Sequence, residues 1–109
     1  MDRKRERIRE LNDAFRKSLV GGRVMLTAEV QALEEVSRAK LLKGVREFDD
    51  FSGRNVPYSE HDFGSVDIEQ ERYFWKIDYH DLSLKFGSSD PSDPNTTTRV
   101  MTIMHASEY

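Results

Sequence analysis

Two stretches of the chain repeat hydrophobic residues every three or four positions, the spacing of one face of an α-helix. In residues 2–20 these positions are Ile8, Leu11, Phe15 and Leu19. Gly21-Gly22 follows directly and supplies a helix stop. In residues 34–48 the predicted inward face consists of Val36, Ala39, Leu42, Val45 and Phe48. Gly44 interrupts this second helix at a cost of about 1 kcal/mol relative to alanine.

The rest of the chain predicts strands and loops. Residues 23–27 are typical of a short strand, whereas residues 28–33 are ambiguous between strand and loop. After a predicted loop at 49–59 the hydrophobic period shortens to two, which indicates strands over 64–69 and 72–79 joined by a turn at Gln70-Glu71. A short strand at 82–86, a loop at 87–96 with two Asp-Pro pairs and a last strand at 97–105 complete the prediction.

The order of these elements predicts an α+β fold, with two helices packed on one face of a small antiparallel sheet of three to five strands. Alternation in the strand at 72–79 places Trp75 on the helix-covered face with Tyr73, Ile77 and Tyr79. We expect a core that contains Phe15, Val45, Trp75 and Ile103. A chain of 109 residues has the usual length of one domain, so residues 1–109 are predicted to form a single domain.

The amino-acid composition and the distribution of charge limit where this protein is expected to act and which partners it is expected to bind. The chain has no cysteine, which favours a reducing, cytoplasmic location, and neither a long apolar segment nor a signal peptide is expected. Its net charge is −3. Residues 1–50 hold 12 Lys/Arg and 10 Asp/Glu, whereas residues 51–109 hold 5 and 10. The second half is therefore a candidate acidic surface, which repels nucleic acid and attracts basic partners.

Four segments together resemble an uncharacterised domain-of-unknown-function family of short alphaproteobacterial proteins. They are IRELNDAFR with GGRVMLTAEVQAL, EHDFG, FWKIDYHDLSLKFGSSDPSDP and TTRVMTIMHASEY. The resemblance covers residues 7–109, and His80 stands where the family commonly has tyrosine. It implies no established activity. It does imply genes carried on plasmids, integrative elements and prophages, where accessory proteins often counter restriction or CRISPR defences.

The densest group of ionisable residues is Glu60-His61-Asp62, with His80 as a second imidazole if the strands meet. A histidine beside carboxylates can act as a general base or bind a metal. These residues are the weak catalytic candidates His61, Asp62 and His80; the alternative is a polar loop that positions the hairpin. Because three scattered histidines without cysteine rarely build a closed metal site, we expect no metal and no cofactor.

Other clusters have simpler interpretations. Asp90, Asp93 and Asn95 offer oxygens for calcium, but the Asp-Pro pairs favour a turn. The first helix places Arg5, Arg9 and Arg16 with Asn12 on one face, which could contact phosphates or form a mixed-charge surface with its neighbouring acids. Trp75 could stack a base, although the alternation favours core packing.

The sequence therefore favours a non-enzymatic binding protein that inhibits a host defence complex by occupying its basic nucleic-acid-binding surface. We expect a protein or ribonucleoprotein partner, and neither a membrane nor direct nucleic-acid binding. The predicted interface consists of Glu60, Asp62, Asp67, Glu69, Phe74, Asp78, Asp81, Asp90 and Asp93. The alternatives are a small metal-dependent hydrolase using His61, Asp62 and His80, and a nucleic-acid-binding accessory protein using the first helix.

Overall fold

The computed structural model describes residues 3–51 and 60–109. The chain forms α1 (Arg3–Ser18), β1 (Gly22–Leu26), α2 (Ala28–Gln31), α3 (Glu35–Arg46), β2 (Phe63–Ile68), β3 (Glu71–His80), β4 (Thr98–His105) and a final 3₁₀ turn, η2 (Ala106–Glu108). The predicted helices and strands at these positions are confirmed, and the ambiguous segment 28–33 contains the short helix α2. Most of the predicted loop at 49–59 lies outside the described residues.

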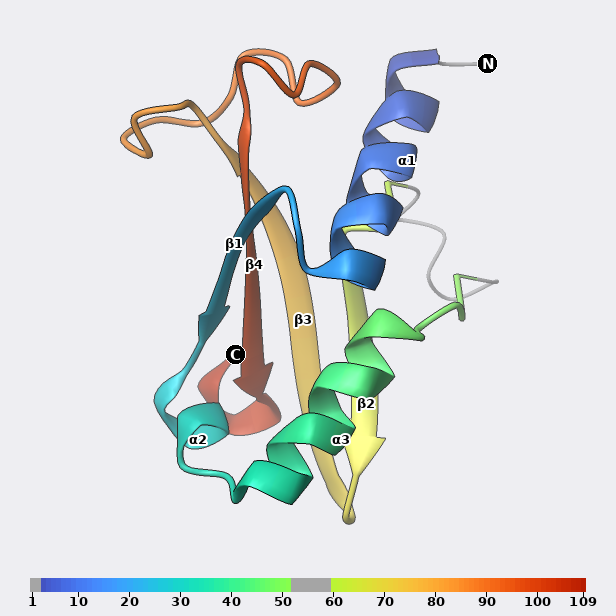
Figure 1. The fold of residues 1–109 in the computed structure, drawn as a ribbon, viewed down its shortest axis with the longest axis vertical. Coiled ribbons are helices and arrows are strands. Elements are labelled where there is room, and N and C mark those ends of the chain that lie inside the picture. The colour runs from blue at the N-terminus through green and yellow to red at the C-terminus, as the bar shows by residue number, and fades with distance from the viewer. Residues whose placement is uncertain (1–2, 52–59) are drawn as a thin grey trace.

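The four strands form one sheet in the order β1-β4-β3-β2 (Figure 1). β2 pairs antiparallel with β3, and β3 pairs antiparallel with β4. β1 pairs parallel with β4, so the sheet is mixed and mostly antiparallel rather than wholly antiparallel. The α+β class is confirmed. Contrary to the prediction, the sheet is not wholly antiparallel, because β1 pairs with β4. No short loop joins these two strands, so the connection does not force them to run antiparallel.

Helices α1 and α3 lie on the same side of the sheet, and the core fills the space between them and the strands (Figure 1). The predicted core residues are buried: Trp75 and Ile103 are 0% exposed, Val45 1% and Phe15 2%. Alternation in β3 also holds, because Tyr73 and Ile77 are buried beside Trp75. Gly64 on β2 faces the indole, and a Cβ there would lie 2.6 Å from Trp75 Nε1. A side chain at this strand position would therefore displace the tryptophan.

The predicted inward face of α3 is wrong at two positions. Val36 is 67% exposed and Ala39 is exposed, whereas Leu41, which was not predicted, is fully buried. The reason is the close approach of α3 to β2 at Gly44, where a Cβ would lie 2.6 Å from Val66 Cγ1. This contact turns the helix so that Leu41 and Val45, one turn apart, face the sheet.

Two local predictions also need correction. The hairpin turn consists of Glu69 and Gln70, with φ of 50° and 69°, the paired positive values that tight two-residue hairpins use. The predicted strand at 82–86 is instead a turn organised by Asp81, whose Oδ1 accepts hydrogen bonds from Ser83 Oγ at 2.8 Å and from Lys85 N at 3.1 Å. Side-chain capping of this kind competes with strand pairing.

Candidate functional site

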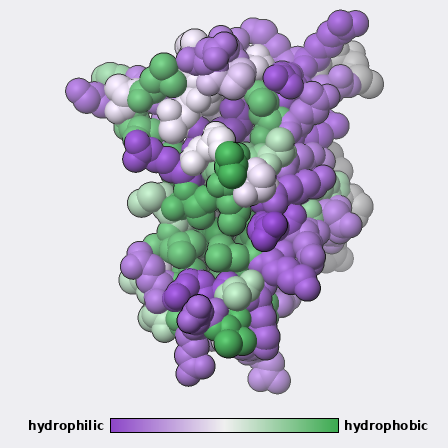
Figure 2. Space-filling model, viewed as in Figure 1, coloured by the Kyte–Doolittle hydropathy of each residue, from purple (hydrophilic) through white to green (hydrophobic). Residues whose placement is uncertain are grey.

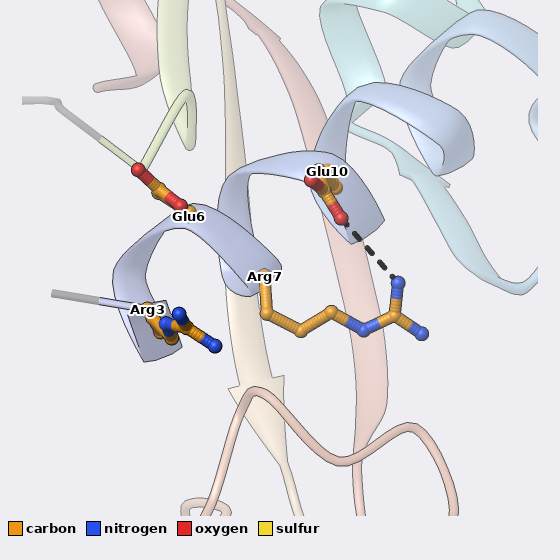
Figure 3. A pocket seen from close by; sticks show the side chains of 4 residues that line it. All are labelled: Arg3, Glu6, Arg7 and Glu10. Atoms are coloured by element: carbon orange, nitrogen blue, oxygen red, sulfur yellow. Dashed lines mark ion pairs between the residues drawn. The ribbon is translucent and has the colours of Figure 1, made fainter.

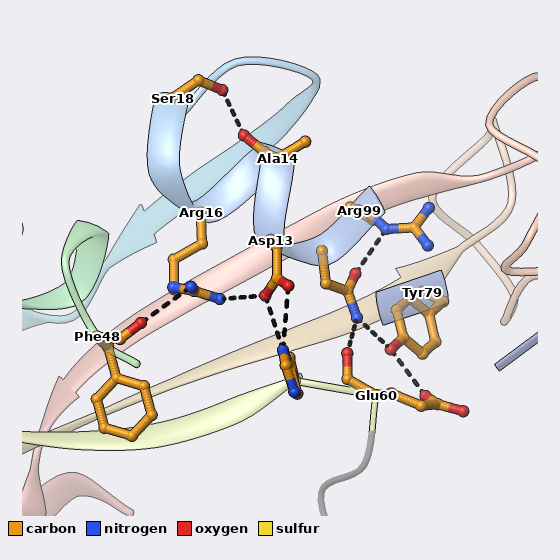
Figure 4. A network of polar contacts seen from close by, with 10 residues as sticks. Asp13, Ala14, Arg16, Ser18, Phe48, Glu60, Tyr79 and Arg99 are labelled. Carbon is orange, nitrogen blue, oxygen red and sulfur yellow. Dashed lines mark hydrogen bonds and ion pairs between the residues drawn. The ribbon is translucent and has the colours of Figure 1, made fainter. Parts of the chain in front are cut away.

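A buried hydrogen-bond network joins α1 to the sheet, with Asn12 at its centre (Figure 4). Asn12 is 0% exposed. Its Nδ2 donates to the Glu60 carbonyl oxygen at 3.0 Å and to the Tyr79 hydroxyl at 2.8 Å. Its Oδ1 accepts from Arg99 Nε at 2.7 Å. One amide on the first helix thus satisfies polar groups that arrive from three other parts of the chain.

Arg99 and Tyr79 complete this network on the sheet side. The Arg99 guanidinium lies 5.2 Å from the centre of the Tyr79 ring and donates from Nη2 to the Pro91 carbonyl at 2.6 Å. The Tyr79 hydroxyl donates to Glu60 Oε1 at 2.8 Å. Burial raises the pKa of Tyr79 and lowers the pKa of Arg99. Tyr79 therefore stays protonated and acts as a donor at neutral pH.

A second group of contacts centres on the Asp13 carboxylate. Asp13 Oδ1 accepts from Arg16 Nη1 at 3.0 Å and lies 2.9 Å from His61 Nδ1. Arg16, only 1% exposed, also donates from Nη2 to the Phe48 carbonyl at 3.0 Å. The carboxylate thus joins the buried arginine of α1 to the segment that precedes β2 (Figure 4).

Aromatic rings enclose the charged groups of this second cluster. The Arg16 guanidinium lies 5.3 Å from the centre of the Phe51 ring and 5.2 Å from that of Trp75, in cation–π contact with both. The His61 ring stacks on Phe51 with centroids 3.6 Å apart and an interplanar angle of 3°. His61 also has a φ of 57°, in the left-handed region. Packing and hydrogen bonding together hold its imidazole in one orientation.

The hydrogen bond of His61 reaches a residue outside the predicted catalytic set. His61 Nδ1 binds Asp13, a residue the sequence did not single out, rather than Asp62 or His80. His80 lies at the end of β3, where it pairs with Thr98. Across residues 3–51 and 60–109, no group of three or more His, Asp or Glu side chains is placed to hold a metal ion.

The phosphate-binding interpretation of the α1 face is contradicted at two of its four positions. Asn12 and Arg16 are buried in the contacts above, so neither is available to a phosphate. On the exposed side of α1 lies a hollow of about 530 Å³ lined by Arg3, Glu6, Arg7 and Glu10 (Figure 3). Arg7 and Glu10 form an ion pair at 3.5 Å, so this surface is of mixed charge.

The predicted acidic residues are spread over the molecule instead of forming one continuous face. Asp67 and Glu69 lie at the β2–β3 turn, at the opposite end of the molecule from the loop that carries Asp90 and Asp93 (Figure 1). Asp67 pairs with Arg72 at 2.9 Å, a contact that lowers the pKa of Asp67. Hydrogen bonds from Ser37 lower the pKa of Glu69.

The acids of the loop after β3 hold turns together. Asp90 Oδ1 accepts from Ser92 N at 3.2 Å, and Asp93 Oδ1 accepts from Asn95 N at 2.9 Å. The turn interpretation of these aspartates is confirmed, since their side-chain oxygens bind their own backbone. Asp81 has the same role in the preceding turn, where its bond from Ser83 lowers its pKa.

At the start of β2 three carboxylates remain close to one another. The Asp62 carbonyl accepts from Ile77 N at 2.8 Å, which extends the β2–β3 pairing by one residue. Burial raises the pKa of Asp62, and the charges of Glu60 and Asp78 raise it further. Asp78 in turn pairs with Lys76 at 3.2 Å. Like charges are therefore held together here in the folded protein.

The face of the sheet away from α1 and α3 carries an aromatic cluster of Phe63, Phe74 and Tyr109. Ring centroids lie 5.4 Å apart for Phe63 and Phe74, and 5.2 Å apart for Phe74 and Tyr109. Tyr109 is 73% exposed, and Phe74, predicted as the exposed apolar residue of this face, is half-buried beneath it. Beside the cluster is a hollow of about 410 Å³ lined by Thr27, Lys76, Thr102, Met104, Glu108 and Tyr109.

A family model described as "Protein of unknown function (DUF3768)" matches residues 26–108. The chain belongs to the DUF3768 family. The prediction of an uncharacterised family is thereby confirmed. No curated protein and no solved structure matches the chain.

The DUF3768 match includes every residue of the aromatic cluster except Tyr109, but it excludes all of α1. Even so, α1 supplies Phe15 to the core and Asn12 and Arg16 to the polar contacts. The folded core of this protein therefore includes residues that precede the family match.

Sequence reasoning missed Asn12 and Arg99 as members of one network and Asp13 as the partner of His61. It also missed Phe63 and Tyr109 as members of one cluster. Phe63 had a signal, because extending the alternation of β2 by one residue would have placed it beside Phe74 on the uncovered face. The network had none, since Arg99 and Asn12 are 87 positions apart.

Proposed function

We propose that this protein is a non-enzymatic binding protein that recognises a basic protein or ribonucleoprotein surface through the uncovered face of its sheet. The observation that carries the proposal is the aromatic cluster formed by Phe63 of β2, Phe74 of β3 and Tyr109. The crowded carboxylates belong to Asp62, which directly precedes β2, and to Asp78 of β3.

Aromatic side chains supply much of the energy at protein interfaces because they bury a large area with few rotatable bonds. Tyr109 is 73% exposed and Phe74 is half-buried, and both lie on the face away from α1 and α3. The carboxylates supply the complementary charge. In the free protein Glu60 and Asp78 disfavour the ionised form of Asp62, and a cation from a partner would relieve this repulsion.

The resemblance found in the sequence gives the proposal its setting, that of alphaproteobacterial genes on plasmids, integrative elements and prophages. In that setting the partner is a host defence complex, of the CRISPR or restriction type, whose basic channel normally holds nucleic acid in the cytoplasm. Occupation of the channel by this protein would exclude DNA or RNA.

The experiment is capture of partners from host lysate by the tagged protein, with mass spectrometry, followed by binding measurements with the purified partner. Phe74→Ala combined with Tyr109→Ala should weaken binding at least tenfold, as loss of aromatic anchors does. Val36→Ala is the matched control, because Val36 is 67% exposed on the helix-covered side. Equal binding by the three proteins, or capture of no basic partner, would contradict the proposal.

Asp62→Asn separates a binding role from a folding role. The variant removes a carboxylate whose ionised form is disfavoured by burial and by the charges of Glu60 and Asp78, so it should stabilise the free protein while weakening the complex. Glu47→Gln, at an exposed position after α3, should change neither quantity. If Asp62→Asn binds as well as the natural protein, the carboxylates lie outside the interface.

A second candidate, a small hydrolase, is favoured by one observation, the contact between Asp13 and His61 Nδ1 at 2.9 Å. A carboxylate on this nitrogen is the arrangement that orients a histidine general base. In this candidate hydrolase the residue that assists His61 is Asp13, and not Asp62 or His80 as the sequence suggested. It predicts turnover in a panel of ester and phosphoester substrates that His61→Gln abolishes, and no turnover in the unmodified protein would eliminate it.

A further inference from the structure

β1 is an edge strand whose outer side is unpaired among the described residues, because the sheet order places β4 alone beside it. Figure 1 shows the strand at the margin of the sheet. Thr27 N donates to Ile103 O at 3.2 Å, and Leu26 is in register with Ile103. In a parallel pair this pattern turns the backbone groups of Arg23 and Met25 toward β4. The N–H and C=O groups of Gly22, Val24 and Leu26 therefore point away from the sheet.

The contacts of Leu26 support this orientation. Its carbonyl oxygen accepts from Gln31 Nε2 at 2.6 Å, a side chain that lies outside the sheet. A carbonyl has a second lone pair, so this bond leaves the outer edge able to accept another.

Natural edge strands are usually blocked by proline, by a bulge or by inward charges, because an open edge invites pairing with another strand. β1, with the sequence GRVML, has none of these, and its single charge is Arg23. Hydrophobic side chains border the edge on both faces. Met25 is 54% exposed on the uncovered face, while Val24 and Leu26 pack against the margin of the core on the other. Figure 2 shows apolar side chains gathered over this part of the molecule.

We infer that β1 pairs antiparallel with β1 of a second copy of this chain, which would join two four-stranded sheets into one. The occupant is a second copy because the edge is complementary to itself about a two-fold axis at Val24. In that register each Val24 exchanges two hydrogen bonds with the other, and Gly22 pairs with Leu26 on either side. The outward-pointing N–H and C=O groups of Gly22, Val24 and Leu26 then have hydrogen-bond partners in both copies.

Charge favours the same register. Arg23 of one copy lies opposite Met25 of the other, so the two arginines do not face each other. An axis at Arg23 would instead oppose like charges and leave Leu26 unpaired. The apolar margins at Val24 and Leu26 meet across the axis and become buried.

The register predicts that two substitutions at Met25 change the affinity of the dimer in opposite directions. Met25→Glu places a carboxylate opposite Arg23 of the second copy, and Met25→Lys places an ammonium there. Because each dimer contains two such pairs, we expect the first variant to tighten the dimer about 2- to 30-fold and the second to weaken it by a similar factor. Met25 is exposed, so both variants should fold. Sedimentation equilibrium over a range of protein concentrations measures the dissociation constant, with Val36→Lys as the control that leaves it unchanged.

Amide hydrogen exchange supplies the second readout. Protection of the Val24 and Leu26 amides should rise with protein concentration, whereas that of the Arg23 and Met25 amides should not, because β4 already binds their side of the strand. A protein that stays monomeric up to about millimolar concentration, or a dimer that responds equally to both charges at position 25, would overturn the inference. It does not depend on the proposed function, since Phe63, Phe74 and Tyr109 take no part in it.

Discussion

The two faces of the sheet differ in what their side chains do, although the same strands supply both. On the helix-covered face β3 and β4 bury Trp75, Ile77, Met101 and Ile103, with polar groups such as Arg99 bound by partners from α1. On the uncovered face the alternate residues Phe74 and Lys76 contact solvent or Tyr109. Stability is concentrated on the first face, which leaves the second free to vary and to bind.

The comparison is tested most severely by Trp75→Ala on the covered face. Trp75 is fully buried and touches Phe48, Phe51 and the Arg16 guanidinium, so truncation should cost about 3–5 kcal/mol and leave the domain close to unfolding. Chemical denaturation monitored by circular dichroism measures the loss.

Phe74→Ala is the matched control, one residue along the same strand on the other face. It should keep the fold with a clearly smaller loss of stability. A Trp75→Ala protein as stable as Phe74→Ala would show that the two faces do not differ in this way.

The next largest effect is expected from Asn12→Ala. The substitution leaves Arg99 Nε without an acceptor and removes the donor to the Tyr79 hydroxyl oxygen, while the bonds from Arg99 to Pro91 and from Tyr79 to Glu60 remain. Each buried polar group that loses its partner costs about 1–3 kcal/mol. Unfolding in urea measures the change, with the exposed residue Asn95, substituted by alanine, as control. A loss no greater than that of the control would mean that α1 is held by apolar packing alone.

Asp62→Asn has a smaller effect of opposite sign, and it depends on pH. Because the folded-state pKa of Asp62 is raised, the natural protein loses stability as pH rises from the unfolded value of 3.8 through the higher folded one. The asparagine variant does not titrate, so it should be the more stable protein at pH 7. The difference should disappear below pH 3.8, where Asp62 is protonated in both states. Thermal unfolding from pH 3 to 7 gives the curve, and a constant difference across that range would contradict the prediction.

The smallest effect is expected from reversing two acids at the β2–β3 turn, Asp67→Lys with Glu69→Lys. Both side chains are exposed and pair with exposed cations, so the fold should be preserved. In the proposed complex the change should slow association, chiefly at low salt, because it alters long-range attraction rather than contact. Stopped-flow measurements at two salt concentrations test this, with Glu6→Lys and Glu10→Lys on α1 as the comparison. Loss of binding through the α1 variants alone would move the interface to the helix-covered side.

Local patterns in the chain were enough to determine α1, α3, the four strands and the covered face of β3, but not α2 or the turn at 82–86. Alternation placed Trp75 and Tyr73 inward, and the three- and four-residue spacing placed Phe15 inward, because these periods are properties of the backbone geometry of strand and helix. The same reasoning failed for α3, where Leu41 and Leu42 are equally apolar and only the approach at Gly44 selects between them.

Other features were decided by tertiary structure alone. The parallel pairing of β1 with β4 and the burial of Arg16, Arg99 and Asn12 depend on residues far apart in the chain, such as the 87 positions between Asn12 and Arg99. A charged residue on a helix usually faces solvent, and the sequence offers no sign of the exceptions. Burial of an arginine becomes tolerable only once the fold brings acceptors and aromatic rings around it, so its position is a consequence of the assembled structure and not of its neighbours in the chain.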